Sequence, residues 1–217
     1  MQEIIFVIVT LVTNVSTHFS EHAKLVRQGG FSLLELLIVL LIAAALLALA
    51  GPAFSTSLQN SRLLAAAGRL GSDIALARNE ASTRRSHVAL CASADGTICA
   101  GSDWESGWIV FVDDGAGGGI GANGARDGNE ILLKITEAAA EGVTIRSHNF
   151  DYSDWIMLQD SGRLGFAEGG TFVICDSRGA DKARAINLNG VGHTRLATDE
   201  DGDGIAEDDR GAPTKCT

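Results

Sequence analysis

The chain is 217 residues long and acidic, with 17 lysines and arginines against 27 aspartates and glutamates and a formal net charge of −10. This length suits one globular domain of ordinary size with an appendage. The acidic balance favours solubility and argues against a protein that binds polyanions in general.

Residues 1–30 are predicted to be a leader peptide, separate from the fold. The apolar stretch IIFVIVTLVTNV, residues 4–15, is too short to span a bilayer and lacks a preceding basic region. It is therefore a poor secretory signal. An alternative is that translation starts near Leu25 or Val26, which leaves the short basic leader VRQGG.

The segment from residue 31 to residue 50 is apolar except at Ser32 and Glu35. A helix of about 20 residues is about 30 Å long, which is enough to cross the hydrocarbon core once. We therefore expect residues 31–52 to form a transmembrane helix. An ionised carboxylate at membrane depth costs roughly 2 to 4 kcal/mol, so Glu35 needs a partner or a purpose there.

Basic residues predict the orientation of this helix. Lys24 and Arg27 precede it, and the next basic residue after it is Arg62. Because basic flanks favour the cytoplasmic side, we expect a single-pass membrane protein with its N-terminus in the cytoplasm and everything after Pro52 exported.

Apolar residues after Pro52 recur every three or four positions, which indicates an amphipathic helix over residues 53–86. Polar residues such as Asp73 fall between the members of this series, and Pro52, Gly68 and Gly71 are the positions where the helix can bend. The series is Phe54, Leu58, Leu64, Ala67, Leu70, Ile74, Ala77 and Ala81.

Eight short segments with strand character follow, separated by turns rich in glycine and asparagine. They are HVALC (87–91), GWIVFVDD (107–114), EILLKI (130–135), GVTIRS (142–147), WIMLQ (155–159), GTFVICD (170–176), ARAINL (183–188) and HTRLA (193–197). They predict a mostly antiparallel sheet or two packed sheets, on which the C-terminal half of the helix lies. The fold class is α+β, with a β-rich head over residues 87–217 that ends in an acidic tail, residues 198–217.

Gly30, Phe31 and Glu35, at the head of an unbroken apolar helix, resemble the leader of type IV pilins and type II secretion pseudopilins. The resemblance implies that a prepilin peptidase cuts between Gly30 and Phe31 and methylates the new amino group of Phe31. It also implies that the Glu35 carboxylate meets the N-terminal amine of a neighbouring pilin among packed helices. The alternative is a plain membrane anchor whose Glu35 reaches the cytoplasmic headgroups.

Three later segments are similar to the FimT/GspH family of type IV minor pilins and type II secretion minor pseudopilins. They are WESGWIVFVDD, RDGNEILLKI and SGRLGFAEGGTFVICDSRGADKARAINLNGVGHTRLA. The resemblance runs from residue 29 to about residue 197, and the tail is peripheral to it. It implies a pilin-like fold and a structural subunit at or near a fibre tip, with other pilins as partners. It also implies a single-pass protein of the bacterial inner membrane, with its N-terminus in the cytoplasm and its head in the periplasm.

The four cysteines all follow the apolar helix and form no Cys-x-x-Cys motif, which favours two disulfides in an oxidising compartment. Cys91 and Cys99 flank a turn at Asp95-Gly96, so their sulfurs can meet across a hairpin. Cys175 would then pair with Cys216 and hold the acidic tail to the sheet. Four cysteines allow three pairings, and the sequence leaves all three open.

The tail sequence DEDGDGIAEDD places Asp199, Asp201 and Asp203 at alternate positions before Gly204, a pattern typical of calcium loops. Arg210 stands where an EF-hand has its bidentate glutamate, so the loop is not an EF-hand. The residues that can complete a less regular shell are Glu207, Asp208 and Asp209. A calcium site and a solvated acidic tail remain as alternatives, and no other cofactor is expected.

A second acidic loop is a weaker metal candidate on the same grounds. It contains Asp113, Asp114, Asp127, Asn129 and Glu130. Its glycine-rich part, residues 115–124, has the spacing of a dinucleotide fingerprint, but no helix follows to bind a phosphate, so we interpret it as a surface loop.

No catalytic motif stands out. His87, His148 and His193 are scattered along the chain, and neither His-Glu-x-x-His nor Gly-x-Ser-x-Gly occurs. We therefore predict that the protein is not an enzyme.

DNA binding is the alternative function, because the family resemblance attaches it to a Gly-Arg-x-Arg element. The corresponding run here is Gly192-His193-Thr194-Arg195, in which histidine replaces the first arginine. Arg195 together with Arg163, Arg178 and Arg184 forms the candidate DNA-binding set. Basic and acidic residues are equally numerous between residues 142 and 198, so ordinary surface charge is the simpler interpretation.

The function we expect is that of a minor pilin or pseudopilin in a type II secretion pseudopilus or a type IV pilus. A DNA-binding minor pilin is the first alternative. A membrane-anchored periplasmic domain that never polymerises is the second.

Overall fold

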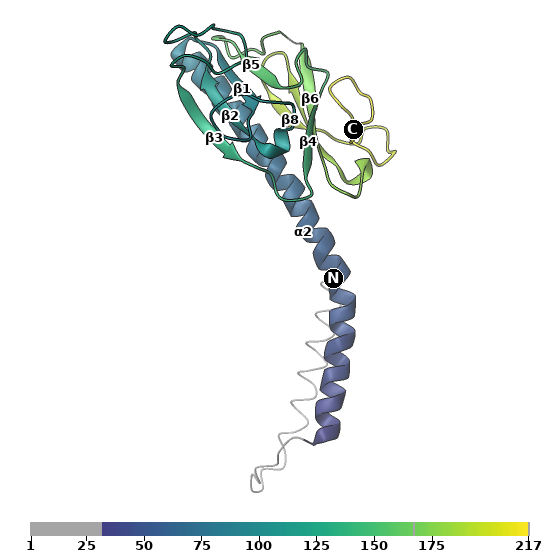
Figure 1. Ribbon diagram of the computed structural model, residues 1–217. Helices are drawn as coiled ribbons and strands as arrows, with labels where there is room; N and C mark the ends of the chain where they lie inside the picture. The colour runs from purple at the N-terminus through teal and green to yellow at the C-terminus, as the bar shows by residue number, and fades with distance from the viewer. Residues whose placement is uncertain (1–31, 167, 217) are drawn as a thin grey trace, which may run out of the picture. The chain divides into compact units, whose positions relative to one another are not determined.

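The computed structural model describes residues 32–166 and 168–216, apart from the side chains of residues 45 and 47–53. The chain divides into two compact units, Met1–Pro52 and Ala53–Thr217. Helix α2, Leu33–Arg84, begins in the first unit and ends in the second. Its helical assignment continues through Pro52, Gly68 and Gly71, so these residues do not end the helix (Figure 1).

All eight predicted strands are present, and each boundary lies within two residues of the expected one. The strands are β1 (Val88–Ala92), β2 (Gly107–Val112), β3 (Leu132–Glu137), β4 (Thr144–His148), β5 (Trp155–Leu158), β6 (Gly169–Cys175), β7 (Arg184–Asn189) and β8 (Thr194–Leu196). Two short 3-10 helices, Trp104–Ser106 and Ala180–Lys182, precede β2 and β7.

The strands form two four-stranded sheets, and every neighbouring pair is antiparallel. The first has the order β3-β2-β1-β5 and the second has the order β4-β6-β7-β8. Of the two arrangements left open by the sequence, the structure has the one with two sheets.

One hydrophobic core joins the helix to the inner faces of both sheets. Strand alternation places Val88, Leu90 and Ala92 on the inner face of β1, and Phe172 and Ile174 on that of β6. The helix contributes Leu63, Ala66, Ala67, Leu70, Ile74, Ala77 and Ala81, all almost fully buried. Because four of these seven are alanines, the helix can lie close to the strands.

The predicted apolar face of the helix is correct from Ala67 onward and wrong before it. Phe54, Leu58 and Leu64 are exposed, with 72 %, 44 % and 49 % of their surface accessible, whereas Leu63 is buried. Leu63 lies seven residues before Leu70 and so shares its helix face, while Leu64 is turned about 100° away.

Asp73 is one of the polar residues that fall between the members of the apolar series, yet it is buried. It lies seven residues after the buried Ala66, and its side chain is fully buried. Its carboxylate accepts hydrogen bonds from the Trp108 indole and the Thr136 hydroxyl and pairs with the Lys134 ammonium. The buried charge is therefore compensated by three partners.

The two disulfides join Cys91 to Cys99 and Cys175 to Cys216, one of the three pairings that the sequence left open. The first closes the loop after β1. The second attaches the end of the chain to β6, where Cys216 packs with Val173.

The acidic tail is part of the folded head. It lies on the outer face of the second sheet, where the Asn187 side chain donates to the Glu207 carbonyl at 3.1 Å. The Thr171 hydroxyl donates to Asp209 at 3.0 Å and accepts from the Asp209 backbone N–H at 2.8 Å. These bonds, together with the disulfide to Cys175, order a segment that charge alone would leave solvated.

Candidate functional site

Glu35, the residue expected to act in assembly, lies at the start of helix α2. The Glu35 backbone N–H donates to the Ser32 hydroxyl at 3.3 Å, and the Leu36 N–H donates to the Ser32 carbonyl at 3.1 Å. Ser32 is therefore the N-cap and Glu35 stands three residues after it, the sequence pattern of a capping box. Glu35 also lies in the first turn, where the helix dipole favours negative charge. Gly30 and Phe31, between which cleavage is expected, lie outside the described part of the chain.

The Ser-x-x-Glu spacing was visible in the sequence. The roles expected for Glu35 were assembly into a fibre and, as the alternative, contact with cytoplasmic headgroups. Its place at the start of the helix was not among them. A place in the helix cap is compatible with a role in assembly, because the cap uses the backbone N–H of Glu35 and leaves its carboxylate exposed.

The first turns of α2 expose a continuous apolar surface. From residue 33 to residue 42, every large apolar side chain is at least 49 % exposed. In the second unit, Phe54, Leu58 and Leu64 are exposed as well. Large exposed apolar surfaces mark contacts with other proteins or with membranes. Within the described part of the chain, no helix is both long and apolar enough to cross a membrane.

The tail brings four carboxylates together. Ligand oxygens of Asp199, Asp201, Asp203 and Glu207 all lie within 4.8 Å of one another. Three of these residues are exposed, and Glu207 is only 7 % exposed. Hard cations such as calcium prefer oxygen ligands gathered in this way.

Backbone bonds shape this acidic loop. Asp199 accepts the N–H groups of Gly202 and Gly204 at 2.7 and 2.9 Å, and Glu207 accepts the Glu200 N–H at 2.8 Å. Both glycines have φ above 80°, a conformation that disfavours other residues.

Only one of the three further acids suggested by the sequence joins this cluster. Asp208 and Asp209 instead accept the Asn149 amide at 2.9 and 2.7 Å and hold the tail to the head. Their roles follow from the path of the tail across the second sheet, which the local sequence does not reveal.

The second acidic loop binds its own backbone. Asp113 accepts the N–H groups of Asn123 and Gly124, and Glu130 accepts those of Gly115 and Asp127. Burial raises the pKa of both the Asp113 and the Glu130 carboxyl groups. These acids serve as acceptors that shape the glycine-rich loop.

The three remaining members of that loop also make local contacts. Asp114 accepts the Ala116 N–H at 3.0 Å, and Asp127 accepts the Ile120 N–H at 3.0 Å. Asn129 packs against Gly117, where an added Cβ would lie only 2.6 Å from the Asn129 amide nitrogen. The loop therefore depends on glycine at residue 117 for close packing.

The candidate DNA-binding arginines do not converge on one surface. Arg178 bonds Asp176 through two nitrogens and Asn60 through a third, and its guanidinium holds the pKa of the Asp176 carboxyl below the usual value. Arg195 on β8 lies opposite Asn187 on β7, so both side chains are on the same face of the sheet. Arg184 lies three positions before Asn187 on β7 and is therefore on the opposite face, because side chains alternate along a strand. Arg163 is exposed in the loop after β5.

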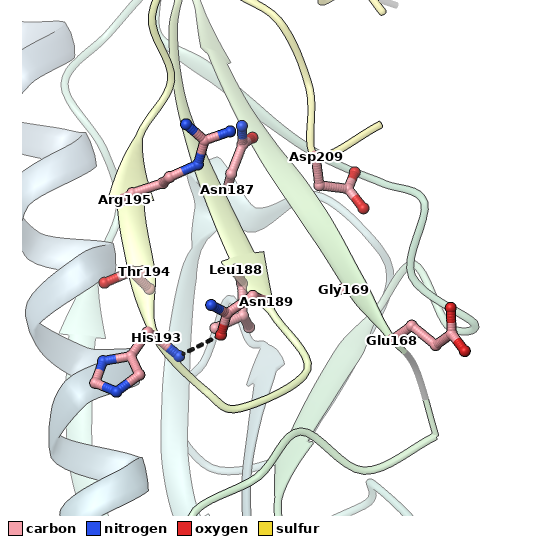
Figure 2. A pocket seen from close by; sticks show the side chains of 9 residues that line it. All are labelled: Glu168, Gly169, Asn187, Leu188, Asn189, His193, Thr194, Arg195 and Asp209. Atoms are coloured by element: carbon pink, nitrogen blue, oxygen red, sulfur yellow. Dashed lines mark hydrogen bonds between the residues drawn. The ribbon is translucent and has the colours of Figure 1, made fainter. Parts of the chain in front are cut away.

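Arg195 lines a pocket of about 310 Å³ on the outer face of the second sheet. Figure 2 shows its side chain beside that of Asn187, with Asp209 and Glu168 on the other side of the pocket. Arg195 also lies 3.5 Å from Glu200, and both side chains are largely exposed. Because carboxylates surround its one arginine, the pocket is a poor phosphate site.

The three histidines noted in the sequence occupy separate elements. His87 precedes β1, His148 ends β4, and His193 lies at the turn before β8, where its N–H donates to the Asn189 side chain at 3.0 Å (Figure 2). They do not form a shared site.

Comparisons with known proteins agree with this architecture. Residues 66–192 match the family model of the type II transport protein GspH, and residues 25–51 match the prokaryotic N-terminal methylation motif. None of the curated proteins compared with the chain matches it significantly.

Two solved structures are similar. The type IV minor pilin FimU of Pseudomonas aeruginosa is 20 % identical, with a TM-score of 0.51 over 73 % of this chain and 98 % of that one. The minor pseudopilin EpsH from the type 2 secretion system of Vibrio cholerae is 11 % identical, with a TM-score of 0.41 over 62 % of this chain and 95 % of that one.

A long helix that begins within a methylation motif and packs its C-terminal part on antiparallel sheets defines a pilin-type protein. The chain belongs to the type II transport protein GspH family, whose model covers more than half of it. Its role is that of a minor pilin or pseudopilin, and the family and fold are those of structural proteins rather than enzymes. Strand β8 and the tail lie beyond the family match.

Proposed function

We propose that the protein is a minor subunit of a type II secretion pseudopilus or a type IV pilus. Before assembly, residues 31–52 anchor it in the inner membrane, with the N-terminus in the cytoplasm and the head in the periplasm. The observation that carries the proposal is the methylation-motif match at residues 25–51, directly ahead of a GspH-type head. The exposed apolar surface at residues 33–42 supplies a contact for helices of other subunits.

Processing is the first test of this proposal. When the full chain is made together with a prepilin peptidase, intact-mass analysis should find an N-terminus at N-methylated Phe31. Gly30→Leu should block cleavage, and Gln28→Leu, which changes the leader outside the cut bond, should not. A chain that keeps residues 1–30 beside an active peptidase would instead be the non-polymerising anchored domain.

Substitution of Glu35 is the second test. Because Ser32 caps the helix, separate variants can remove the charge of Glu35 and weaken the cap. Glu35→Gln removes the charge but keeps the hydrogen-bonding length of a capping residue. We expect it to leave membrane insertion intact and to reduce incorporation into fibres, because the partner of a neighbouring N-terminal amine is lost. Ser32→Ala weakens the cap and keeps the charge, so it should reduce incorporation much less. Equal incorporation of Glu35→Gln and the unmodified chain would contradict an assembly role for Glu35.

Calcium is the cofactor we propose for the tail. The convergence of four carboxylates within 4.8 Å, one of them on the buried Glu207, supports it. A bound cation would offset the repulsion among these acids. Its role would be to stiffen the loop beside β8.

DNA uptake is the alternative function within this family resemblance, and the charges of the head do not favour it. Arg178 is neutralised by Asp176, and Arg184 and Arg195 lie on opposite faces of one sheet. A gel-shift assay at low salt tests it: binding of duplex DNA that weakens with Arg195→Gln and strengthens with His193→Arg would favour DNA uptake.

A further inference from the structure

A second pocket, of about 260 Å³, lies between helix α2 and the turn from β7 to β8. The helix side offers residues three, four and seven apart, which share one face. The lining consists of Ala75, Arg78, Asn79, Ser82, Gly192, His193 and Thr194. Among these lining residues there are hydroxyl, amide, imidazole and guanidinium groups and no carboxylate, although the chain has a net charge of −10.

Arg78 is held in place at this pocket by the backbone. Its Nε donates to the Gly162 carbonyl at 3.2 Å. Gly162 and Gly192 have φ of 74° and 77°, and a Cβ added at either one would lie 3.2 Å or less from the Arg78 side chain. In the described structure, the two terminal nitrogens of Arg78 have no hydrogen-bond or ion-pair partner. Arg78 is thus an oriented guanidinium with free donors.

Strand β8 forms the other wall, and it is an edge strand. The Asn189 N–H donates to the His193 carbonyl, and the Ala197 N–H donates to the Ala185 carbonyl. The backbone groups of His193 and Ala197 therefore point toward β7. In a strand of an antiparallel pair, the backbone N–H and C=O groups of successive residues point alternately toward the partner strand and away from it. The backbone groups of Thr194 and Leu196 therefore point toward the open edge. Unpaired backbone groups of an edge strand are a template for adding another strand.

We infer that this site binds an extended, acidic segment of a neighbouring fibre subunit, which pairs with β8 and places one carboxylate on Arg78. The inference rests on the proposed function, because a fibre supplies the neighbour. A carboxylate accepts two parallel bonds from a guanidinium, and the hydroxyls of Ser82 and Thr194 can donate further bonds. One fixed arginine suits a single carboxylate better than a nucleic-acid backbone, which needs several cationic contacts and is repelled by the acidic head.

The test uses the full chain in detergent micelles and fluorescence anisotropy with a labelled Thr-Glu-Val-Glu-Thr peptide. The amide peptide Thr-Gln-Val-Gln-Thr is its matched control. We expect the acidic peptide to bind and the control to bind at least about tenfold more weakly. Arg78→Gln should weaken the acidic peptide by about tenfold. Lys182→Gln makes the same charge change at the other end of β7 and should leave binding unchanged.

Two variants of Thr194 test whether the peptide adds as a strand beside β8. Thr194→Pro removes an N–H that faces the open edge and does not serve the ladder with β7, so the fold should survive while peptide binding falls. Thr194→Val removes only the hydroxyl and should bind better than the proline variant. Circular dichroism confirms that each variant is folded.

Three results would overturn the inference. They are equal binding of the two peptides, binding that is insensitive to Arg78→Gln, and displacement of the acidic peptide by duplex DNA at lower concentration than by the unlabelled peptide. None of them bears on the proposed function, since Phe31 processing and the Glu35 requirement are measured separately. Conversely, a chain that is never processed but still binds the peptide would contradict only the fibre role.

Discussion

The carboxylate of Asp73 on helix α2 accepts a hydrogen bond from the indole Nε1 of Trp108 on strand β2 at 2.9 Å. Both side chains are fully buried. The same carboxylate accepts the Thr136 hydroxyl at 2.6 Å and pairs with Lys134, so one helix residue is joined to two strands of the first sheet. These bonds fix how the helix is rotated and positioned against that sheet, which apolar packing alone specifies less strictly.

Removing Asp73 should therefore be costly. We expect Asp73→Ala to lower the free energy of unfolding by about 3–5 kcal/mol, because the Trp108 and Thr136 donors lose their acceptor and Lys134 loses its partner. Urea denaturation followed by tryptophan fluorescence measures this change. Asp181→Ala, an exposed acid in the β6–β7 connection, is the control and should stay within about 0.5 kcal/mol. A loss below about 1 kcal/mol for Asp73→Ala would show that the buried network contributes little.

Two glycines should respond to alanine in opposite directions. Gly68 is helical, and nothing lies within 4 Å of an added Cβ, so Gly68→Ala should stabilise the protein by about 0.5–1 kcal/mol. Gly107 has φ of 112°, and its Cβ would lie 2.7 Å from the Thr136 carbonyl oxygen, so Gly107→Ala should destabilise by more than about 1 kcal/mol. Thermal unfolding of the two variants checks the signs, and a Gly68→Ala variant less stable than the original would mean that the helix surface is covered there.

Calcium should raise the melting temperature of the protein if the tail site binds it. At a free calcium concentration about 100 times the dissociation constant, the expected stabilisation is about 2.7 kcal/mol. Asp201→Ala should abolish this increase, while Asp160→Ala, an acid outside the cluster, should leave it unchanged. Identical melting curves with calcium and with a chelator would mean that the four carboxylates are solvated without an ion.

The loop closed by Cys91 and Cys99 should lose stability in acid. Hydrogen bonds from the backbone N–H groups of Thr97 and Ile98 lower the pKa of Asp95 from 3.8 to about 2. Since the pKa is lower in the folded state, the contribution of the ionised group is complete above pH 3.8 and disappears as the pH falls toward about 2. The stability difference between the original chain and Asp95→Asn should shrink across this window. A carboxyl resonance of Asp95 that titrates near 3.8 in NMR would contradict the assignment.

Local sequence patterns were enough to predict the secondary-structure elements of this protein. Alternating β-branched and aromatic residues between glycine-rich turns located all eight strands, because these residue types and the turns that bound them can be recognised within short stretches of sequence. Gly30, Phe31 and Glu35 lie in the segment that matches the methylation motif, and these residues by themselves indicate the pilin class. These features could be inferred because each lies within a short stretch of sequence.

The tertiary structure decided which side chains face which partner. Leu63 rather than Leu64 enters the core, and Asp73 is buried rather than solvated, because the rotation of the helix against two sheets sets its buried face. In the same way, Glu207 joins the acidic cluster while Asp209 bonds Asn149, a partner 60 residues away in sequence. A helical or alternating pattern limits the orientations that a segment can take, and long-range packing between distant segments selects the one that buries the most apolar surface with its polar groups bonded.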